Sequence, residues 1–334
     1  MTTEQLDAVR ISPIGLGSWA MGGAGWPASL GAQHDHDSLE TMAAAVAAGI
    51  NWIDTAPYYG LGHAEELIGR WIAALPADER PMVFTKCGVV WESATVQPRE
   101  ILSPSNIRRE CEDSLRRLGV ERLDLLQAHW PTTDDTPVQE SWATLADLVQ
   151  EGKTRWIGVS NFDVELLTAC EQIRHVDTLQ PPFSMLRRDA ADELIPWCYD
   201  HGTAVIVYSP LESGLLAGSF TRERVLALAP DDVRLEREEV FCEPALSRNL
   251  QFVRDLVLIA ERLGLSIAEL AAAWVIAWPG VTGTILGART PRQLRTWAGA
   301  ASVDLDHEAV SEITNLLVAT GVGSGPVVPR DLQR

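Results

Sequence analysis

GINWIDTAPYYG, at residues 49–60, contains the pattern that decides the fold. Its first half is a short apolar run with β-branched and aromatic residues, which is typical of a buried strand. A proline and a glycine then interrupt regular structure. Asp54 and the adjacent Tyr58 and Tyr59 therefore lie at the carboxyl end of this strand and in the loop after it. Taken alone, the same residues would also suit a tight turn, with Asp54 bonded to the backbone and both tyrosines packed.

The same alternation of apolar run and amphipathic segment recurs along the chain. The apolar runs cover residues 11–19, 50–56, 82–88, 123–130, 155–162, 178–183, 204–210 and 282–288. The helical segments cover about 36–48, 64–74, 104–118, 137–151, 163–173, 191–201, 251–263 and 291–300. In segment 104–118, Ser103 is expected as the cap and Pro104 as the first helical residue. The apolar face of that segment is formed by Ile107, Cys111, Leu115 and Leu118.

Strands that alternate with helices imply parallel strands joined by crossover helices. At 334 residues a closed (β/α)8 TIM barrel is favoured over an open doubly wound sheet, and no G-x-G-x-x-G follows the first strand. The sequence predicts one domain over residues 1–334, with its core at about 10–300, an N-terminal extension and a C-terminal tail. Segment 219–248 is charged and lacks clean periodicity, so it is expected to form a lid loop with short helical pieces.

Composition excludes several classes of partner. The formal net charge is −19, which argues against nucleic acid or an anionic membrane surface. The five cysteines are scattered and never form a C-x-x-C pair, so neither a disulfide framework nor a metal site is expected. An apolar signal region and long uncharged apolar stretches are both absent from the sequence. The expectation is a soluble cytoplasmic protein that acts on a small molecule.

Polar residues follow most of the expected strands. In a parallel barrel the carboxyl ends of all strands meet at one rim, where functional groups gather. A lone lysine or histidine at a strand end is usually an exposed or structural group, but several ionisable types at one rim are typical of a functional site. The residues at these positions are Asp54, Tyr59, Lys86, His129, Ser160, Asn161, Gln180, Tyr208 and Ser209.

An aspartate, a tyrosine, a lysine and a histidine can together polarise and protonate a carbonyl. A free phenol titrates near pH ~10, which is too high for an efficient acid at neutral pH. A nearby lysine is expected to lower the pKa of the phenol, and the aspartate to keep that lysine charged and in place. The histidine can orient the substrate oxygen. This group offers no nucleophile for acyl transfer and no metal cage, so it needs a separate source of hydride.

Seven segments in order, DTAPYYGLGHAEELIG, FTKCG, LLQAHWP, IGVSNF, LQPPFSMLRR, YSPLESGLLAG and LGARTPRQL, resemble the aldo-keto reductase superfamily over about residues 10–300. Within it the chain looks most like the bacterial general-stress and inositol-cluster reductases. In the family pattern the tyrosine immediately before the glycine is the proton donor. The resemblance therefore implies a catalytic tetrad of Asp54, Tyr59, Lys86 and His129, with Tyr58 as its variable neighbour.

The resemblance also implies a nicotinamide cofactor across the barrel mouth, NADPH/NADP+ with NADH as the alternative. Hydroxyl and amide groups suited to the carboxamide come from Ser160, Asn161 and Gln180, and Tyr208 offers a ring for stacking. Segment 209–218 would line the pyrophosphate, provided that Glu212 points away; taken alone, it also reads as an ordinary loop. The residues implied there are Ser209, Pro210, Leu211 and Ser213.

The last strand and helix are implied to hold the adenosine 2′-phosphate. Arg289 is the main candidate, and a helix N-terminus there would favour an anion. Thr296 and Trp297 depart from the family pattern, which has an acid and an asparagine at these positions, so the adenine contact differs. The residues implied in this part of the site are Gly287, Arg289, Thr290 and Gln293.

Aromatic residues in the loops of the catalytic rim are expected to form an apolar substrate mouth. Such a rim suits both flat hydrophobic carbonyls and sugars, and the alternative role for each residue is to anchor its loop. The candidates are Trp26, Tyr58, Trp91, Trp130 and Phe183. The sequence does not choose the substrate, the direction of the reaction or the oligomeric state.

Two other functions fit a barrel of this kind. A Schiff-base aldolase would use Lys86, but it needs a lysine without an ion-pair partner, and Asp54 argues against it. An NADPH-binding redox sensor with little turnover is the second alternative. The complete tetrad favours a reductase of aldehydes or ketones.

Overall fold

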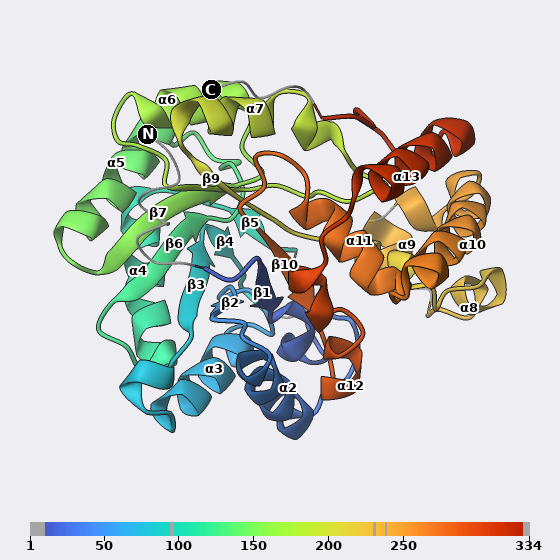
Figure 1. The fold of residues 1–334 in the computed structure, drawn as a ribbon. Coiled ribbons are helices and arrows are strands. Elements are labelled where there is room, and N and C mark those ends of the chain that lie inside the picture. Colours follow the sequence, from blue (N-terminus) through green and yellow to red (C-terminus); the bar gives the residue numbers. More distant parts are fainter. Residues whose placement is uncertain (1–10, 94–96, 230–231, 238, 330–334) are drawn as a thin grey trace.

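Eight parallel strands close into a barrel in the computed structural model, which describes residues 11–93, 97–229, 232–237 and 239–329 (Figure 1). The strands are β1 (Ile14–Gly17), β2 (Trp52–Asp54), β3 (Met82–Cys87), β6 (Leu123–Ala128), β7 (Thr154–Ser160), β8 (Thr178–Gln180), β9 (Ala204–Val207) and β10 (Gly283–Gly287). Around the barrel they follow the order β1-β10-β9-β8-β7-β6-β3-β2. The predicted (β/α)8 barrel is confirmed.

A crossover helix follows most of these strands and covers the outside of the barrel. These helices are α2 (Asp35–Ala47), α3 (His63–Ala73), α4 (Pro104–Leu118), α5 (Val138–Gln150), α6 (Val164–Glu171) and α7 (Leu194–His201). In α4 the predicted bounds and buried face are confirmed. Ser103 occupies the N-cap position, but among the described residues its hydroxyl makes no capping bond.

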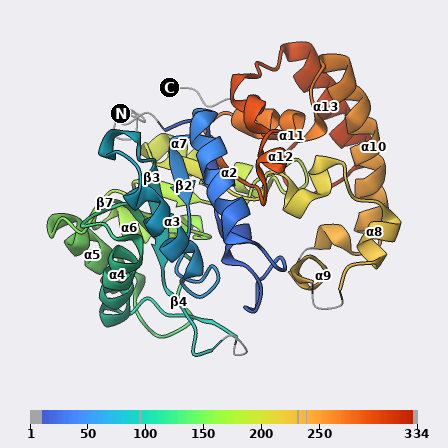
Figure 2. The same ribbon diagram turned by 90° about the horizontal axis from the view of Figure 1, so that it is seen from below.

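The chain between β9 and β10 departs from a simple crossover. It carries α8 (Arg222–Leu226), α9 (Val233–Arg237), α10 (Ala245–Leu263) and α11 (Ile267–Ile276), and α13 (His307–Thr320) packs on α10. In both ribbon views α8, α10 and α13 lie to one side of the barrel, away from α4 and α5 (Figures 1 and 2). Short helical pieces were expected in segment 219–248, and α8 and α9 are such pieces.

Three elements in this part of the chain differ from the sequence-based expectation. Helix α11 was missed because its apolar residues surround the whole helix and give no stripe, although the capping box of Ser266 and Glu269 marks its start. The expected C-terminal tail contains α13, which buries Ile313 and Leu317. The predicted helix 291–300 is wrong: α12 (Pro291–Leu294) ends early, because the chain turns to bury Trp297.

Side chains that point into the barrel form a tight apolar plug below the rim. Because side chains alternate along a strand, every second residue faces inward. Gly15 is required opposite Trp52, since a Cβ there would collide with the indole ring. The plug consists of Trp52, Phe84, Leu125, Trp156, Ala204, Ile206 and Ile285.

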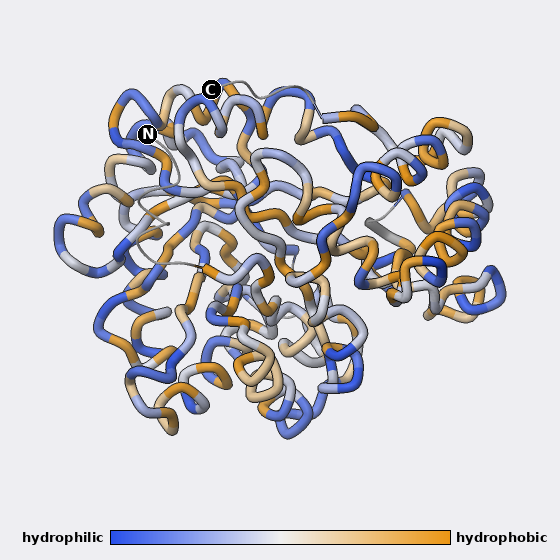
Figure 3. The backbone as a smooth tube through the Cα atoms, viewed as in Figure 1, coloured by the Kyte–Doolittle hydropathy of each residue, from blue (hydrophilic) through white to orange (hydrophobic). Residues whose placement is uncertain are grey.

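A larger apolar layer lies between the strands and the helices, where the other face of each strand is buried. Figure 3 shows hydrophobic colour concentrated on the inner elements and mixed with hydrophilic colour along the outer helices. A short hairpin, β4 (Val89–Val90) with β5 (Arg99–Glu100), projects beyond β3 and was not predicted. The plug and the outer layer together fix the strand ends, on which the site is built.

Candidate active site

The alternation of the strands places the polar rim residues directly above the plug. Asp54 lies two residues beyond Trp52, and Lys86 lies two residues beyond Phe84, so both side chains point inward. His129 follows β6, four residues beyond Leu125, and reaches the same space one layer higher. The register of the sheet therefore brings together residues that are far apart in sequence.

Lys86 and Asp54 form a buried ion pair at the floor of the barrel mouth. Lys86 Nζ lies 2.6 Å from Asp54 Oδ1 and donates a second hydrogen bond to the carbonyl of Thr55 at 3.0 Å. The side chains are only 1% and 4% exposed. The other carboxylate oxygen of Asp54 accepts a bond from Gln180 Nε2 at 2.8 Å. Each oxygen of this carboxylate is thus satisfied, as a buried charge requires.

Tyr59 stands beside this pair on the loop between β2 and α3. Its ring centroid lies 5.3 Å from Lys86 Nζ and 5.9 Å from the ring centroid of His129. The loop is held by Gly60, which has a φ of 64° and packs against the backbone of Gly22. A Cβ added at Gly22 would lie 2.6 Å from the Gly60 nitrogen, so neither position has room for a side chain.

Burial shifts the pKa values of Tyr59, Lys86 and His129 in the direction that favours the neutral form of each side chain. Burial raises the pKa of Tyr59 well above its usual value, and the charge of Asp54 raises it further. Burial lowers the pKa of His129 well below its usual value, with Lys86 acting in the same direction. Burial also lowers the pKa of Lys86, against the opposing attraction of Asp54.

The expectation that lysine would lower the pKa of the phenol is therefore wrong, since burial and Asp54 raise that pKa. Asp54 sits on the Lys86 ammonium and offsets its charge, while burial penalises the phenolate. At neutral pH the site holds a protonated Tyr59 and an uncharged His129. A phenol that keeps its proton is in the state needed to donate it.

A chain of hydrogen bonds links the tetrad to the residues expected to bind a carboxamide. Tyr208 Oη donates to Asn161 Oδ1 at 2.8 Å, and Asn161 Nδ2 donates to the carbonyl of His129 and to Ser160 Oγ, both at 3.0 Å. Ser160 Oγ in turn donates to the carbonyl of Gln180 at 2.8 Å. The structure thus gathers all four residues beside the tetrad.

A cavity of about 1080 Å³ opens over the tetrad, and Asp54, Tyr59 and His129 are exposed to it. The aromatic rings of Trp26 and Tyr58 meet edge to face in its wall, with centroids 5.2 Å apart. Trp130 also lines the cavity and is 44% exposed. An aromatic mouth is therefore present, built from three of the five expected residues.

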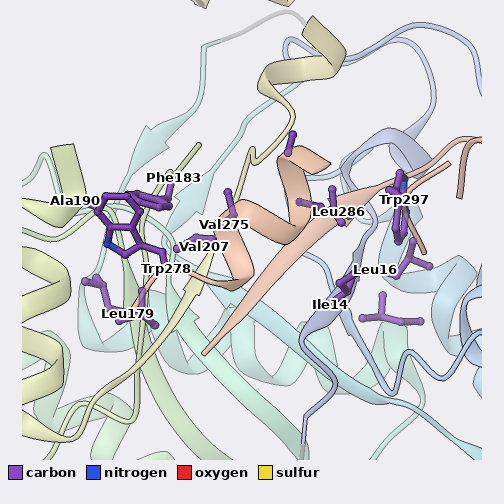
Figure 4. Packing of buried hydrophobic residues seen from close by; sticks show 14 of the residues in the cluster. Ile14, Leu16, Leu179, Phe183, Ala190, Val207, Val275, Trp278, Leu286 and Trp297 are labelled. Carbon is purple, nitrogen blue, oxygen red and sulfur yellow. The ribbon is translucent and has the colours of Figure 1, made fainter. Parts of the chain in front are cut away.

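The other two aromatic candidates lie elsewhere. Phe183 is fully buried and stacks on Trp274 of α11, 5.8 Å between centroids, with Trp278 edge-on beside it (Figure 4). It belongs to the outer core layer and does not line the cavity. Trp91 does not line the cavity. Its ring centroid lies 6.0 Å from that of Tyr58, which fits the role of a loop anchor.

Segment 209–218 forms the wall on the β9 side. Ser209, Glu212 and Ser213 all have positive φ, which is uncommon for residues with a side chain and is frequent at ligand sites. Glu212 is fully buried and points away, accepting a bond from Ser184 Oγ at 2.5 Å and pairing with Arg187 at 3.3 Å. The expected residues that line the cavity here are Ser209, Pro210, Leu211 and Ser213.

At the far end of the cavity, only some of the residues expected to bind the adenosine 2′-phosphate line the cavity. Gly287, Arg289 and Gln293 line it, whereas Thr290 turns inward on its own helix and accepts a bond from the Gln293 nitrogen. Because α12 has one turn, the helix dipole expected there is small. Trp297 lines the cavity but is only 2% exposed, so one edge of its ring at most faces it.

Two lining arginines from segment 219–248 were missed by the sequence analysis. Arg224 and Arg234 both lie over the ring of Phe220, at 4.5 Å and 5.4 Å from its centroid. Arg234 is held by a two-pronged pair with Asp232, at 2.7 Å and 2.6 Å. Their only sequence signal is the positive charge near a phenylalanine. Four described residues of this segment, Ser219, Arg224, Val233 and Arg234, line the cavity, and its role as a lid stays a prediction.

Among the described residues there is no group of three histidine, cysteine or carboxylate side chains placed to hold a metal ion. None of the described helices is long and apolar enough to cross a membrane.

Comparison with known proteins identifies the family. Residues 13–318 match the model of the aldo/keto reductase family. The NADH-specific methylglyoxal reductase of Escherichia coli is 35% identical over 308 residues, covering 89% of this chain and 92% of that protein. The aldo-keto reductase YhdN of Bacillus subtilis is 33% identical, covering 96% and 94%.

Solved structures agree. A glycerol dehydrogenase from Gluconobacter oxydans superposes with a TM-score of 0.84 at 34% identity, covering 96% of this chain and 95% of that one. An aldo/keto reductase from Klebsiella pneumoniae in complex with NADP and acetate gives 0.68 at 29% identity, covering 92% and 91%. With this barrel, this rim and these relatives, the chain belongs to the aldo/keto reductase family, oxidoreductases that act on carbonyl groups with a nicotinamide cofactor.

Proposed function

We propose that the chain reduces an aldehyde or ketone to the alcohol with NADPH, and that Tyr59 donates the proton. The observation that carries this is the position of a protonated Tyr59 between the Lys86–Asp54 pair and His129, on the floor of a large cavity. The preference for NADPH rests on two cavity arginines, Arg224 and Arg289, that have no carboxylate within 4.0 Å among the described residues.

Each residue of the tetrad has one part in the reaction. A nicotinamide cofactor held by the rim residues would supply the hydride for the carbonyl carbon. Tyr59 gives its proton to the carbonyl oxygen, and the resulting phenolate is stabilised by the ammonium of Lys86. His129, uncharged, hydrogen-bonds the same oxygen and orients it. Asp54 holds Lys86 in place, and the Tyr59 phenolate regains its proton from water.

The rim residues would hold the nicotinamide face against the tetrad. Asn161 and Gln180 are already fixed by bonds to neighbouring groups, so little side-chain freedom is lost when a carboxamide binds. Tyr208 is tied to Asn161 and presents its ring to the cavity. Pre-organisation of this kind favours one orientation of the ring and therefore one face for transfer.

The test is consumption of reduced nicotinamide, followed by absorbance, with NADPH or NADH and a panel of carbonyls. The panel includes methylglyoxal, since one relative is named for it, together with aromatic aldehydes, quinones and aldoses. Oxidation that is faster with NADPH supports the proposal. Oxidation only with NADH would leave the reductase assignment and overturn the cofactor preference.

The redox-sensor alternative predicts a different outcome. A sensor would bind NADPH, seen as quenching of tryptophan fluorescence, yet turn over none of these carbonyls. The exposed Trp130, which lines the cavity together with the buried Trp26, favours a substrate site.

A further inference from the structure

Arg289 is held by the loop that precedes α2. Its Nε donates to Gln33 Oε1 at 3.0 Å, its Nη1 to the carbonyl of Leu30 at 3.4 Å, and its Nη2 to the carbonyl of Ala32. Gln33 returns a bond from Nε2 to the Arg289 carbonyl at 2.8 Å. Gln33 Nε2 also donates to Ser38 Oγ at 3.1 Å, which fixes the orientation of the amide. The Gln33 side chain and Arg289 are therefore joined by reciprocal hydrogen bonds between the loops that follow the neighbouring strands β1 and β10.

These bonds use all three nitrogens of the guanidinium. A phosphate or carboxylate binds arginine best through two parallel N–H groups on one edge of the fork. Nε, Nη1 and Nη2 each donate one bond to residues 30–33, and Nε has no second N–H to offer, so the edge formed by Nε and Nη2 already has protein acceptors. A phosphate can bind this edge of Arg289 in the two-pronged mode only if Gln33 Oε1 withdraws from Nε.

The acceptors are neutral, and this makes the arrangement reversible. Among the described residues no carboxylate lies within 4.0 Å of Arg289, so amide and carbonyl dipoles alone balance its charge. Charge-assisted bonds to an anion are about twice as strong as neutral ones. Leu30 and Arg289 both line the cavity, so an anion in the cavity can reach the guanidinium while the loop lies beside it.

We propose that Gln33 sets the preference between NADPH and NADH by competing with the 2′-phosphate for Arg289. NADPH binding releases the guanidinium from residues 30–33, whereas NADH binding leaves these hydrogen bonds intact. The loop is therefore displaced by one dinucleotide and not by the other. This inference rests on the proposed function, since it assumes that a nicotinamide dinucleotide occupies this cavity.

The test compares dissociation constants for NADPH and NADH, measured by quenching of tryptophan fluorescence, in the wild type, Gln33→Ala and Gln33→Glu. Gln33→Ala removes one competing acceptor and is expected to tighten NADPH binding about fivefold, with NADH changed less than about twofold. Gln33→Glu keeps the shape but places a carboxylate on Arg289. It is expected to weaken NADPH binding about fivefold or more, and added salt reduces the effect.

A second readout isolates the adenosine end. The 2′-phosphorylated fragment 2′,5′-ADP should follow NADPH across the variants, and 5′-AMP should follow NADH. Hydrogen exchange at residues 30–33 should rise with NADPH and stay unchanged with NADH.

Three outcomes overturn the proposal in distinguishable ways. If the ratio of the dissociation constants for NADPH and NADH is unchanged in Gln33→Ala, and NADH still binds, then Gln33 does not compete with the 2′-phosphate. Weaker NADPH binding in that variant means that Gln33 positions Arg289 for the phosphate instead. Failure of the wild type to bind either dinucleotide overturns the proposed function, and this inference with it.

Discussion

The cationic side chains at the floor and at the rim of the cavity, Lys86 and Arg289, have partners of opposite kinds. Lys86 is 1% exposed and bound to a carboxylate at 2.6 Å, whereas Arg289 at the rim is held only by neutral acceptors from residues 30–33. Separating the buried pair would leave a charge in a medium of low dielectric constant, which is costly. Exchanging the partners of Arg289 leaves its charge solvated or newly paired. The floor is therefore built to stay fixed, and the rim to change partners.

The largest effect is expected at the floor, from Tyr59→Phe. Loss of a positioned general acid should lower kcat/KM by about 10²–10⁴-fold, while the dissociation constant for NADPH stays nearly unchanged. Steady-state kinetics and fluorescence titration check the two parts. Tyr58→Phe, which also keeps an aromatic ring, should cost far less. Comparable turnover by Tyr59→Phe and the wild type would remove Tyr59 from the proton-transfer step.

Asp54→Asn should destabilise the fold, because it leaves Lys86 buried without an anion. We expect the free energy of unfolding to fall by about 3–5 kcal/mol, measured by urea denaturation. The double variant Asp54→Asn/Lys86→Met removes both charges and should recover part of that loss without recovering activity. A loss below about 1 kcal/mol in the single variant would show that water reaches the pair.

The buried Glu110 on α4 is expected to make the free energy of unfolding depend on pH. Burial raises its pKa from 4.5 to about 7, although the Gly88 N–H donates to its carboxyl group just beyond β3. Between these pH values the unfolded chain has lost this proton and the folded chain keeps it, so stability falls as pH rises. The loss over the window is up to about 3 kcal/mol. Glu110→Gln should flatten this part of the unfolding curve, and an unchanged slope would contradict the assignment.

The smallest effects are expected in segment 219–248, where Arg224 and Arg234 both lie over the ring of Phe220. Arg224 has only the carbonyl of Ser219 as a polar partner among the described residues, whereas Asp232 already offsets the charge of Arg234. Arg224→Ala should weaken dinucleotide binding about threefold, and Arg234→Ala by less than about twofold, at low salt. The reverse order would mean that Asp232 releases Arg234 when the cofactor binds.

Residues on strands were predictable because burial and alternation act locally. The inward layer of Trp52 and Phe84 follows from period two, and so do Asp54 and Lys86 two positions later. Phe183 was misplaced because the loop after β8 gives no periodic signal for the direction of its ring. Helix α11 hid its signal for the opposite reason, since its residues are apolar all round.

The sequence by itself determined the barrel and the family and predicted the four residues of the tetrad, because these follow from short segments whose chemistry is local. Only the tertiary structure decided which partners those residues have. It showed Asp54 offsetting Lys86 and burial keeping the proton on Tyr59, against the expected lowering of its pKa. It also joined Gln33 to Arg289, 256 residues apart, by hydrogen bonds that no local pattern encodes, since they depend on barrel closure, which makes the first and last strands neighbours.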